Sequence, residues 1–198
     1  MLEFGLATRT MPGTEESGDL HLIHEYSQGV MAAAMDGLGH GPEAAFASRQ
    51  CALLLMELAG EPLDAIIAKC HIRLRGTRGL VLSVCTLTEK ASVWSWLGVG
   101  DVFCMLLRDD RRLGRGREFL VQRNGLVGGT LPSLIVSTMA AAPGDIMIFA
   151  TDGVRTRYLY DLNPTGAPQE IAERILDRHA IGNDDALVLV ARHVGGEP

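Results

Sequence analysis

The chain of 198 residues lacks any apolar run long enough to cross a membrane. Its longest unbroken apolar runs, residues 146–150 and 186–191, have the length of strands, whereas a membrane-spanning helix needs roughly 20 apolar residues. The N-terminus carries Glu3 and has no basic segment followed by an apolar one, so it lacks the pattern of a secretory signal. We therefore expect a cytoplasmic protein with no membrane partner.

The sequence also lacks a positive net charge and a paired cysteine motif. Its formal charge of −6 argues against a nucleic-acid partner, because nucleic-acid binding needs a basic face. The cysteines are far apart, form no CxxC pair and stand among apolar residues, which favours buried free thiols over a metal or disulfide role. They are Cys51, Cys70, Cys85 and Cys104.

The composition is that of a globular protein, with 47% hydrophobic and 21% charged residues. We find neither an internal repeat nor a low-complexity linker, so we expect one domain over residues 1–198.

Apolar periodicity predicts many strands and three helices. We expect the strands at 2–8, 19–27, 30–35, 79–88, 91–97, 102–108, 118–122, 133–139, 145–151 and 186–192, and the helices at 42–58, 62–74 and 168–179. The strands between residues 79 and 151 read as one antiparallel meander. Because strands and helices are grouped rather than strictly alternating, we predict an α+β fold. A four-layer α-β-β-α sandwich of two antiparallel sheets flanked by helices would use all these segments.

Acidic residues stand at the ends of three apolar strands. Two strands run into Asp36-Gly37 and Asp152-Gly153, and Asn183-Asp184-Asp185 precedes a third. One Asp-Gly pair is weak evidence, because this dipeptide is common in turns. Three acids in the same structural role can converge on one point if the strands are neighbours.

Two further acids, Asp19 and Asp101, follow glycines in Ser17-Gly-Asp and Gly98-Val-Gly-Asp. Acids brought close together repel one another unless cations neutralise them. Carboxylate ligands select hard divalent ions such as Mg²⁺ or Mn²⁺ rather than zinc.

Four motifs occur in an order that resembles the metal-dependent (type 2C) serine/threonine protein phosphatases. They are Asp36-Gly-Leu-Gly-His-Gly, Gly98-Val-Gly-Asp, Ala150-Thr-Asp-Gly-Val and Asn183-Asp-Asp. The first motif is similar to the bacterial branch that acts on regulators of sigma factors, and the short chain is most similar to the stressosome feedback phosphatases. The resemblance spans nearly the whole chain.

The resemblance implies two divalent cations, Mn²⁺ or Mg²⁺. Asp36 would bridge both ions, and the backbone carbonyl of Gly37 would bind the first. Asp152 and Asp184 would hold the second. A water held between two such cations loses a proton near neutral pH and attacks the phosphate monoester in line.

Three other acids receive different roles from the resemblance. Asp19 would act through metal-bound water, and Asp101 matches an acid that can help to bind a third ion. Asp185 would point to the other face of its strand and support the site from behind.

A general acid and a phosphate-binding arginine are less well defined. His40 can protonate a serine leaving group. Many members of the family, however, place a histidine immediately after the Asp-Gly pair, where this chain has Leu38. The alternatives for His40 are that it caps the following helix or that its side chain is simply solvated. Arg9 is the nearby candidate for the arginine that grips phosphate, and the alternative is an exposed residue at a strand end. The basic run Arg108–Arg117 is either a solvated hairpin loop or a dock for an acidic partner protein.

We therefore predict a monomeric phosphatase that acts on phosphoserine or phosphothreonine in a stress-response regulator. The partner implied by the resemblance is a phosphorylated stressosome scaffold or anti-sigma-antagonist protein. Two alternatives remain open at this point: an inactive phosphatase fold that serves as a binding module, and a metallohydrolase of small phosphate esters.

Overall fold

Ten strands form two antiparallel sheets in the part of the chain that the computed structural model describes, residues 1–109 and 116–195. The first sheet has the strand order β1-β10-β9-β6-β7. Its members are β1 (Leu2–Arg9), β6 (Phe103–Leu107), β7 (Arg117–Phe119), β9 (Ile146–Ala150) and β10 (Ala186–His193). The N-terminal strand β1 therefore pairs with the C-terminal strand β10 and forms one edge of this sheet.

The second sheet has the strand order β2-β3-β4-β5-β8. Its members are β2 (Asp19–Tyr26), β3 (Gly29–Gly37), β4 (Leu80–Thr88), β5 (Val93–Val99) and β8 (Ser137–Ala140). The strand β3 is a continuous apolar run and is buried along almost its whole length. A strand of this kind needs cover on both faces of its sheet.

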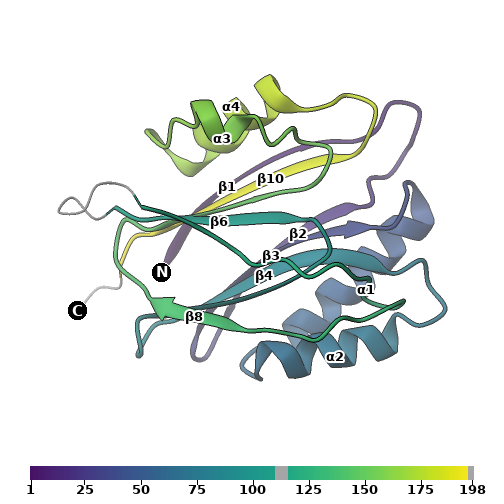
Figure 1. The fold of residues 1–198 in the computed structure, drawn as a ribbon, viewed down its shortest axis with the longest axis horizontal. Helices are drawn as coiled ribbons and strands as arrows, with labels where there is room; N and C mark the ends of the chain where they lie inside the picture. Colours follow the sequence, from purple (N-terminus) through teal and green to yellow (C-terminus); the bar gives the residue numbers. More distant parts are fainter. Residues whose placement is uncertain (110–115, 196–198) are drawn as a thin grey trace.

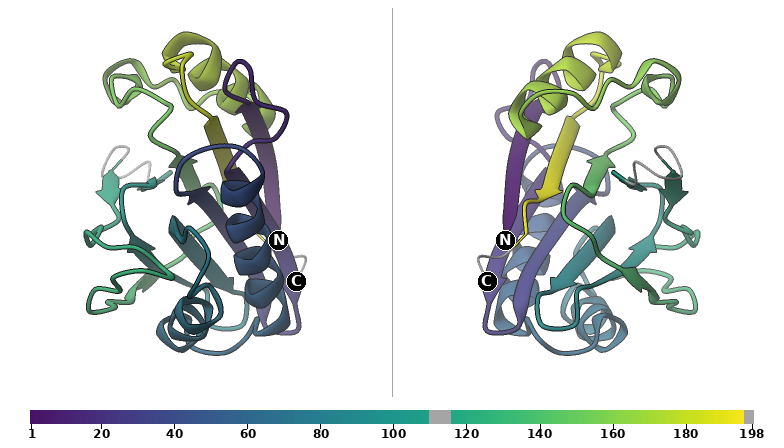
Figure 2. Two further views of the ribbon diagram at one scale, coloured as in Figure 1. Left: turned by 90° about the vertical axis from the view of Figure 1, so that its right-hand side faces the viewer. Right: turned by 90° about the vertical axis from the view of Figure 1, so that its left-hand side faces the viewer.

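Helices provide the outer cover of both sheets (Figures 1 and 2). The helices α1 (Pro42–Glu57) and α2 (Leu63–Arg73) lie on the second sheet, and α4 (Pro168–His179) lies on the first, beside the short α3 (Tyr158–Asp161). The layers thus follow the order α-β-β-α. The predicted four-layer sandwich is confirmed.

Three apolar clusters fill the spaces between these four layers. The central cluster lies between the sheets, where Ala32 and Ala34 of β3 share it with Trp94 of β5 and Phe149 of β9. The two outer clusters lie under α1 and α2 and under α4. The predicted burial of the free thiols is confirmed for Cys51, Cys70, Cys85 and Cys104.

The predicted meander is wrong, because the chain changes sheets within it. The strands β4 and β5 pair with each other in the second sheet, whereas β6 pairs with β9 and β7 in the first. The change occurs around Gly100, which adopts a φ of +90°. A tight hairpin and a crossover to another layer both begin with a glycine-rich turn, so the local sequence does not distinguish them.

Other differences are local. Residues 133–136 of the strand predicted at 133–139 are not in a strand, and the strand predicted at 118–122 is limited to β7. The short helix α3 was not predicted, since four residues show no helical period. No helix in the described ranges combines the length and the apolar character needed to cross a bilayer.

The basic run Arg108–Arg117 is only partly described. Residues 110–115 lie outside the described residues, so the predicted role of this run in docking a partner stays a prediction. Arg108 itself is engaged internally: its guanidinium donates to Glu118 at 3.0 Å and to the buried Asp145 at 2.7 Å. Asp145 also accepts a hydrogen bond from the indole of Trp94 at 3.2 Å.

Candidate metal centre

A cavity of about 480 Å³ collects most of the acids that the sequence singled out. Asp36 comes from the end of β3, and Asp101 lies between β5 and β6. Asp152 follows β9, and Asp184 precedes β10. Both sheets therefore contribute to the cavity, whose lining residues are Met11, Asp36, Leu38, Gly39, His40, Val81, Asp101, Leu126, Asp152, Asn183 and Asp184.

Asp19 and Asp36 face each other across paired strands. The register of β2 and β3 places the two residues directly opposite, an arrangement in which like charges repel at a Cβ separation of about 5 Å. Asp19 is buried, with 8% of its surface exposed. Its Oδ2 accepts a hydrogen bond of 2.7 Å from the hydroxyl of Thr151 in the other sheet.

Burial and mutual repulsion raise the pKa of three of these acids. Burial, followed by the charge of Asp19, raises the pKa of Asp36 to about 9. Burial raises the pKa of Asp19 to about 7, although the hydrogen bond from Thr151 lowers it. Burial and the neighbouring Asp184 raise the pKa of Asp152. A divalent cation would offset the same repulsion.

Close packing requires the glycines of both Asp-Gly pairs, although Asp152-Gly153 also lies in a turn. A Cβ at Gly37 would lie 2.2 Å from the carbonyl oxygen of Ala44 in α1, and one at Gly153 would lie 1.8 Å from that of Asp185. Real Cβ atoms do not approach backbone atoms so closely. Each glycine therefore lets the backbone next to its aspartate pack directly against another segment, α1 at Gly37 and the residues before β10 at Gly153. Gly37 is in fact the last residue of β3.

The two acids before β10 have different environments. Asp184 lines the cavity, and its Oδ1 accepts a hydrogen bond of 2.9 Å from the backbone nitrogen of Asp185. Asp185 is buried and accepts hydrogen bonds of 2.8 Å from the backbone nitrogens of Met11 and Gly18. It therefore fastens the segment that leads into Asp19.

His40 and Asp101 stand at the open side of the cavity, where both are exposed. The helix that follows His40 begins after Gly41, and no side chain caps it. Capping of α1 is therefore excluded as the role of His40. Its position in the cavity wall is compatible with the predicted proton donor.

Arg9 does not line the cavity. Its guanidinium lies 3.5 Å from the carboxylate of Asp177 in α4, and 43% of its side chain is exposed. The structure thus places it at the end of β1, facing the first sheet's outer helix. Its predicted role in gripping phosphate stays a prediction.

The donor set fits hydrated hard cations. In residues 1–109 and 116–195, no three His, Cys, Asp or Glu side chains stand close enough to enclose one ion directly. Mg²⁺ usually keeps several waters and takes only one or two carboxylates. Four carboxylates around one open cavity, with no cysteine and a single histidine among the described residues that line it, meet that requirement.

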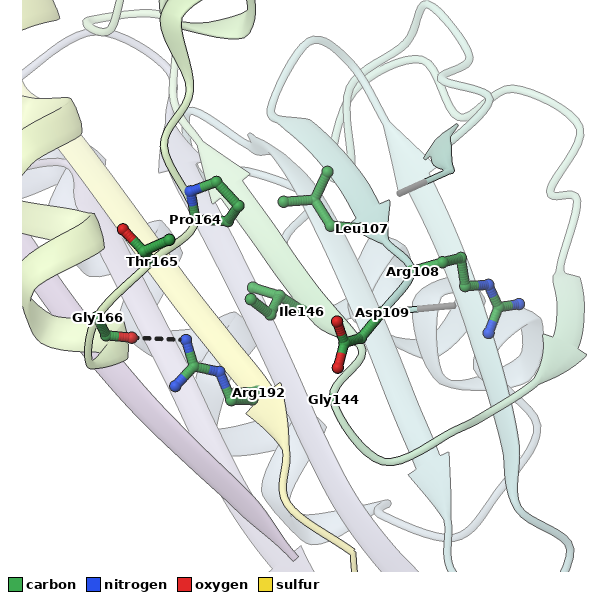
Figure 3. Close-up of a pocket in the computed structure, with 9 residues that line it drawn as sticks. All are labelled: Leu107, Arg108, Asp109, Gly144, Ile146, Pro164, Thr165, Gly166 and Arg192. Atoms are coloured by element: carbon green, nitrogen blue, oxygen red, sulfur yellow. Dashed lines mark hydrogen bonds between the residues drawn. The ribbon is translucent and has the colours of Figure 1, made fainter. Parts of the chain in front are cut away.

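A second cavity, of about 360 Å³, lies at the opposite ends of β9 and β10 (Figure 3). Leu107 and Ile146 contribute apolar wall, and Arg192 donates a hydrogen bond of 2.7 Å to the carbonyl of Gly166. Among the described residues that line it, Asp109 supplies the single carboxylate. This cavity therefore lacks the donors of the first.

Sequence reasoning missed Thr151, which links the two sheets at the site. Its hydroxyl donates to Asp19 and accepts a hydrogen bond of 2.9 Å from the backbone nitrogen of Leu187. The sequence shows only a polar residue between an apolar strand and Asp152. A buried hydroxyl must find partners, and the partner in this case is an acid of the site.

Comparison with known proteins finds no matching family model and no matching curated protein. Solved structures match over nearly the whole chain. One matching chain comes from a structure of the bacterial stressosome, described as a modular system that has been adapted to control secondary messenger signalling. It is 28% identical to this chain, with a TM-score of 0.88. The match covers 97% of this chain and 100% of that chain.

Two phosphatase structures have the same arrangement. RsbX in complex with magnesium is 19% identical with a TM-score of 0.84, over 96% of this chain and 94% of that chain. The PP2C phosphatase domain of SpoIIE from Bacillus subtilis, solved with a fragment of its regulatory domain, is 24% identical with a TM-score of 0.81. That match covers 100% of this chain and 64% of the other.

Proposed function

We propose that this chain, which has the fold of the PP2C-type phosphatases, is a metal-dependent phosphatase acting on phosphoserine or phosphothreonine in proteins. The observation that carries the proposal is the convergence of four aspartates from both sheets on one open cavity. Proteins of the same fold were solved with divalent ions: RsbX with magnesium, and the PstP catalytic domain with two manganese ions. Mg²⁺ or Mn²⁺ is therefore the proposed cofactor.

The acids divide between two proposed ions. Asp36 would bind both, assisted at the first by the carbonyl of Gly37. Asp152 and Asp184 would bind the second, in part through its water ligands, because no three acids among the described residues stand close enough to enclose one ion directly. Asp19 would act through water, and Asp101 would help to hold a third ion. Cations bound there lower the pKa of a bound water and offset charge on the phosphoryl group.

The chain's own groups would orient the reactants. Asp19, fixed by the hydrogen bond from Thr151, would accept a hydrogen bond from a water bound at the site. His40, exposed at the rim, donates a proton to the serine or threonine oxygen that leaves. No covalent enzyme intermediate is needed, which agrees with four buried thiols.

The exposure of the rim favours a protein substrate over a small phosphate ester. His40, Asp101 and Asp152 are all exposed, so a large phosphoprotein surface can approach them. A small ester would be better bound by an enclosed pocket that surrounds it. A binding module without activity would have no need for carboxylates whose crowding destabilises the metal-free fold.

The proposed partner is a phosphorylated regulator of a stress response, of the stressosome scaffold or anti-sigma-antagonist type. Support comes from the likeness to a chain from the bacterial stressosome and to RsbX. The acidic net charge of −6 gives no support to a nucleic-acid partner.

Hydrolysis of p-nitrophenyl phosphate and of a phosphoserine peptide, with Mn²⁺, Mg²⁺ or EDTA, tests this function. We expect activity that requires the metal and is lost in Asp152→Asn. The matched control is Asp64→Asn, an exposed aspartate on α2 outside the cavity, and circular dichroism checks that both variants fold. Metal-independent activity, or full activity in folded Asp152→Asn, would contradict the proposal.

A further inference from the structure

We propose that Arg78 and the cavity beside it form a subsite for an acidic side chain next to the phosphorylated residue of the substrate. This inference rests on the proposed phosphatase function and specifies which protein segments the site accepts. The adjoining cavity has a volume of about 450 Å³ and is lined by Pro42, Glu43, Phe46, Gly76, Thr77 and Arg78.

Backbone pairing holds Arg78 against the loop of the candidate metal centre. Gly37 pairs with Leu80, and the backbone nitrogen of Leu38 donates to the carbonyl of Gly79 at 3.0 Å. Arg78 therefore lies beside Gly39, where a Cβ would stand only 2.8 Å from its Nη1. Gly39 lines the metal cavity and Arg78 lines the adjoining one, so the walls of the two cavities are neighbours at these residues.

The glycine at position 39 is what permits this approach. Gly39 has a φ of +85°, a conformation that side-chain-bearing residues rarely adopt. Any side chain there would meet the guanidinium. The close approach of Gly39 thus places Arg78 beside the wall of the metal cavity.

The charge of Arg78 is only weakly compensated within the protein. Its Nη2 lies 2.6 Å from the carboxylate of Glu43, but 45% and 72% of the two side chains are exposed. An exposed pair of this kind contributes about 0–1 kcal/mol, and a guanidinium has five donors. A substrate carboxylate can therefore bind the remaining donors or replace Glu43.

An acidic substrate segment is the occupant that this arrangement favours. The carboxylates of the metal cavity repel an acidic segment. The positive charge of Arg78 offsets this repulsion, so Arg78 determines whether such a segment can bind beside the cavity. Phe46 is 47% exposed on the first turns of α1 and offers an apolar wall for the methylene groups of a glutamate. Arg9 cannot serve in this way, because it does not line either cavity and pairs with Asp177.

Phosphopeptides that differ at one flanking position test the subsite. Peptides with Glu, Gln or Lys on either side of phosphoserine are compared in Mn²⁺ with the unchanged protein, Arg78→Ala, Arg78→Glu and the control Arg75→Ala, an exposed arginine outside the cavity. For the unchanged protein we expect a preference of about fivefold for Glu over Gln in kcat/KM. Arg78→Ala should abolish the preference, Arg78→Glu should reverse it toward Lys, and Glu43→Gln should strengthen it.

Binding of the same fluorescein-labelled peptides, followed by anisotropy, keeps the test independent of turnover. If the unchanged protein prefers the Glu peptide through Arg78 but hydrolyses nothing with any metal, the proposed function fails and the subsite stands. If hydrolysis is metal-dependent but Arg78→Ala and Arg78→Glu reduce kcat/KM equally for all three peptides, the subsite is wrong and the function stands.

Discussion

Replacing Asp36 with Asn should stabilise the metal-free protein while removing its response to metal. Asp36 faces Asp19 across paired strands and shares a cavity with other acids. In the absence of cations this crowding favours the unfolded chain, where the same acids are far apart. An amide of nearly the same shape removes the charge and keeps the packing.

The magnitude follows from the pKa of Asp36, which is raised from 3.8 to about 9. Between these two values the carboxyl ionises in the unfolded chain but stays protonated in the metal-free fold, so a rise in pH favours unfolding. Each pH unit costs about 1.4 kcal/mol, which gives an upper limit of about 4 kcal/mol at pH 7. Water in the open cavity screens part of this repulsion. We therefore expect Asp36→Asn to raise the free energy of unfolding by about 2 kcal/mol.

Urea unfolding in EDTA, followed by the fluorescence of the buried Trp94 and Trp96, measures the effect. The gain should be about 2 kcal/mol at pH 7 and about 0.8 kcal/mol at pH 5, because pH 5 is much closer to the ordinary pKa of the carboxyl, 3.8. Adding Mn²⁺ should raise the midpoint of the unchanged protein only. Glu57→Gln, at the exposed end of α1, is the control. The reasoning is refuted if Asp36→Asn is the less stable protein in EDTA at pH 7.

Three further substitutions test the site and its support. Thr151→Val removes the hydroxyl that donates to Asp19, so we expect a loss of about 1–3 kcal/mol in urea unfolding and slower hydrolysis; Thr151→Ser should restore most of both, and a fully active Val variant would exclude the orienting role. Gly153→Ala would place a Cβ 1.8 Å from the carbonyl oxygen of Asp185, and we expect a loss of about 1–3 kcal/mol with or without metal; unchanged stability would show that the backbone can shift there. Asp145→Ala leaves a buried indole and a guanidinium without their shared carboxylate, and thermal unfolding should reveal a loss of about 3 kcal/mol with metal-dependent stabilisation retained; a loss below about 1 kcal/mol would contradict this account.

The fold class and the resemblance to PP2C-type phosphatases were predictable because both depend on local patterns. Apolar runs that end in Asp36 and Asp152 are strands whose last residue reaches the rim of a sheet, whatever their neighbours. The helix predicted at 168–179 matches α4 because its apolar residues keep a helical period. Patterns of this kind lie within one segment of the chain, so reading them needs no knowledge of distant residues.

The pairing of strands was not predictable in the same way. Whether β6 continues the sheet of β5 or crosses to the other sheet depends on partners far along the chain, namely β9 and β7. The turn at Gly100 serves either outcome. The sequence between residues 79 and 108 therefore favoured a meander that does not form.

The acidic residues of the site could be predicted from the sequence, whereas the uncharged residues that hold them in place could not. Acids draw attention because their crowding has a chemical meaning, and Asp36, Asp101, Asp152 and Asp184 do line one cavity. Thr151 carries no such signal, because its hydroxyl gains a role only through Asp19 on the facing sheet. The direction of Arg9 likewise depends on Asp177, which α4 brings to it.

The arrangement of the acids has a mechanical consequence. Asp19 and Asp36 belong to the second sheet, whereas Asp152 and Asp184 flank strands of the first. An ion that binds members of both pairs would add a link between the two sheets, which at this end are joined by the hydrogen bonds from Thr151 to Asp19 and from Gly18 to Asp185. Removal of the metal would then weaken the contact between the two sheets at this end. The rate of backbone amide hydrogen exchange should therefore rise at the ends of both β3 and β9. Protease sensitivity of this protein would in that case follow the free metal concentration around it.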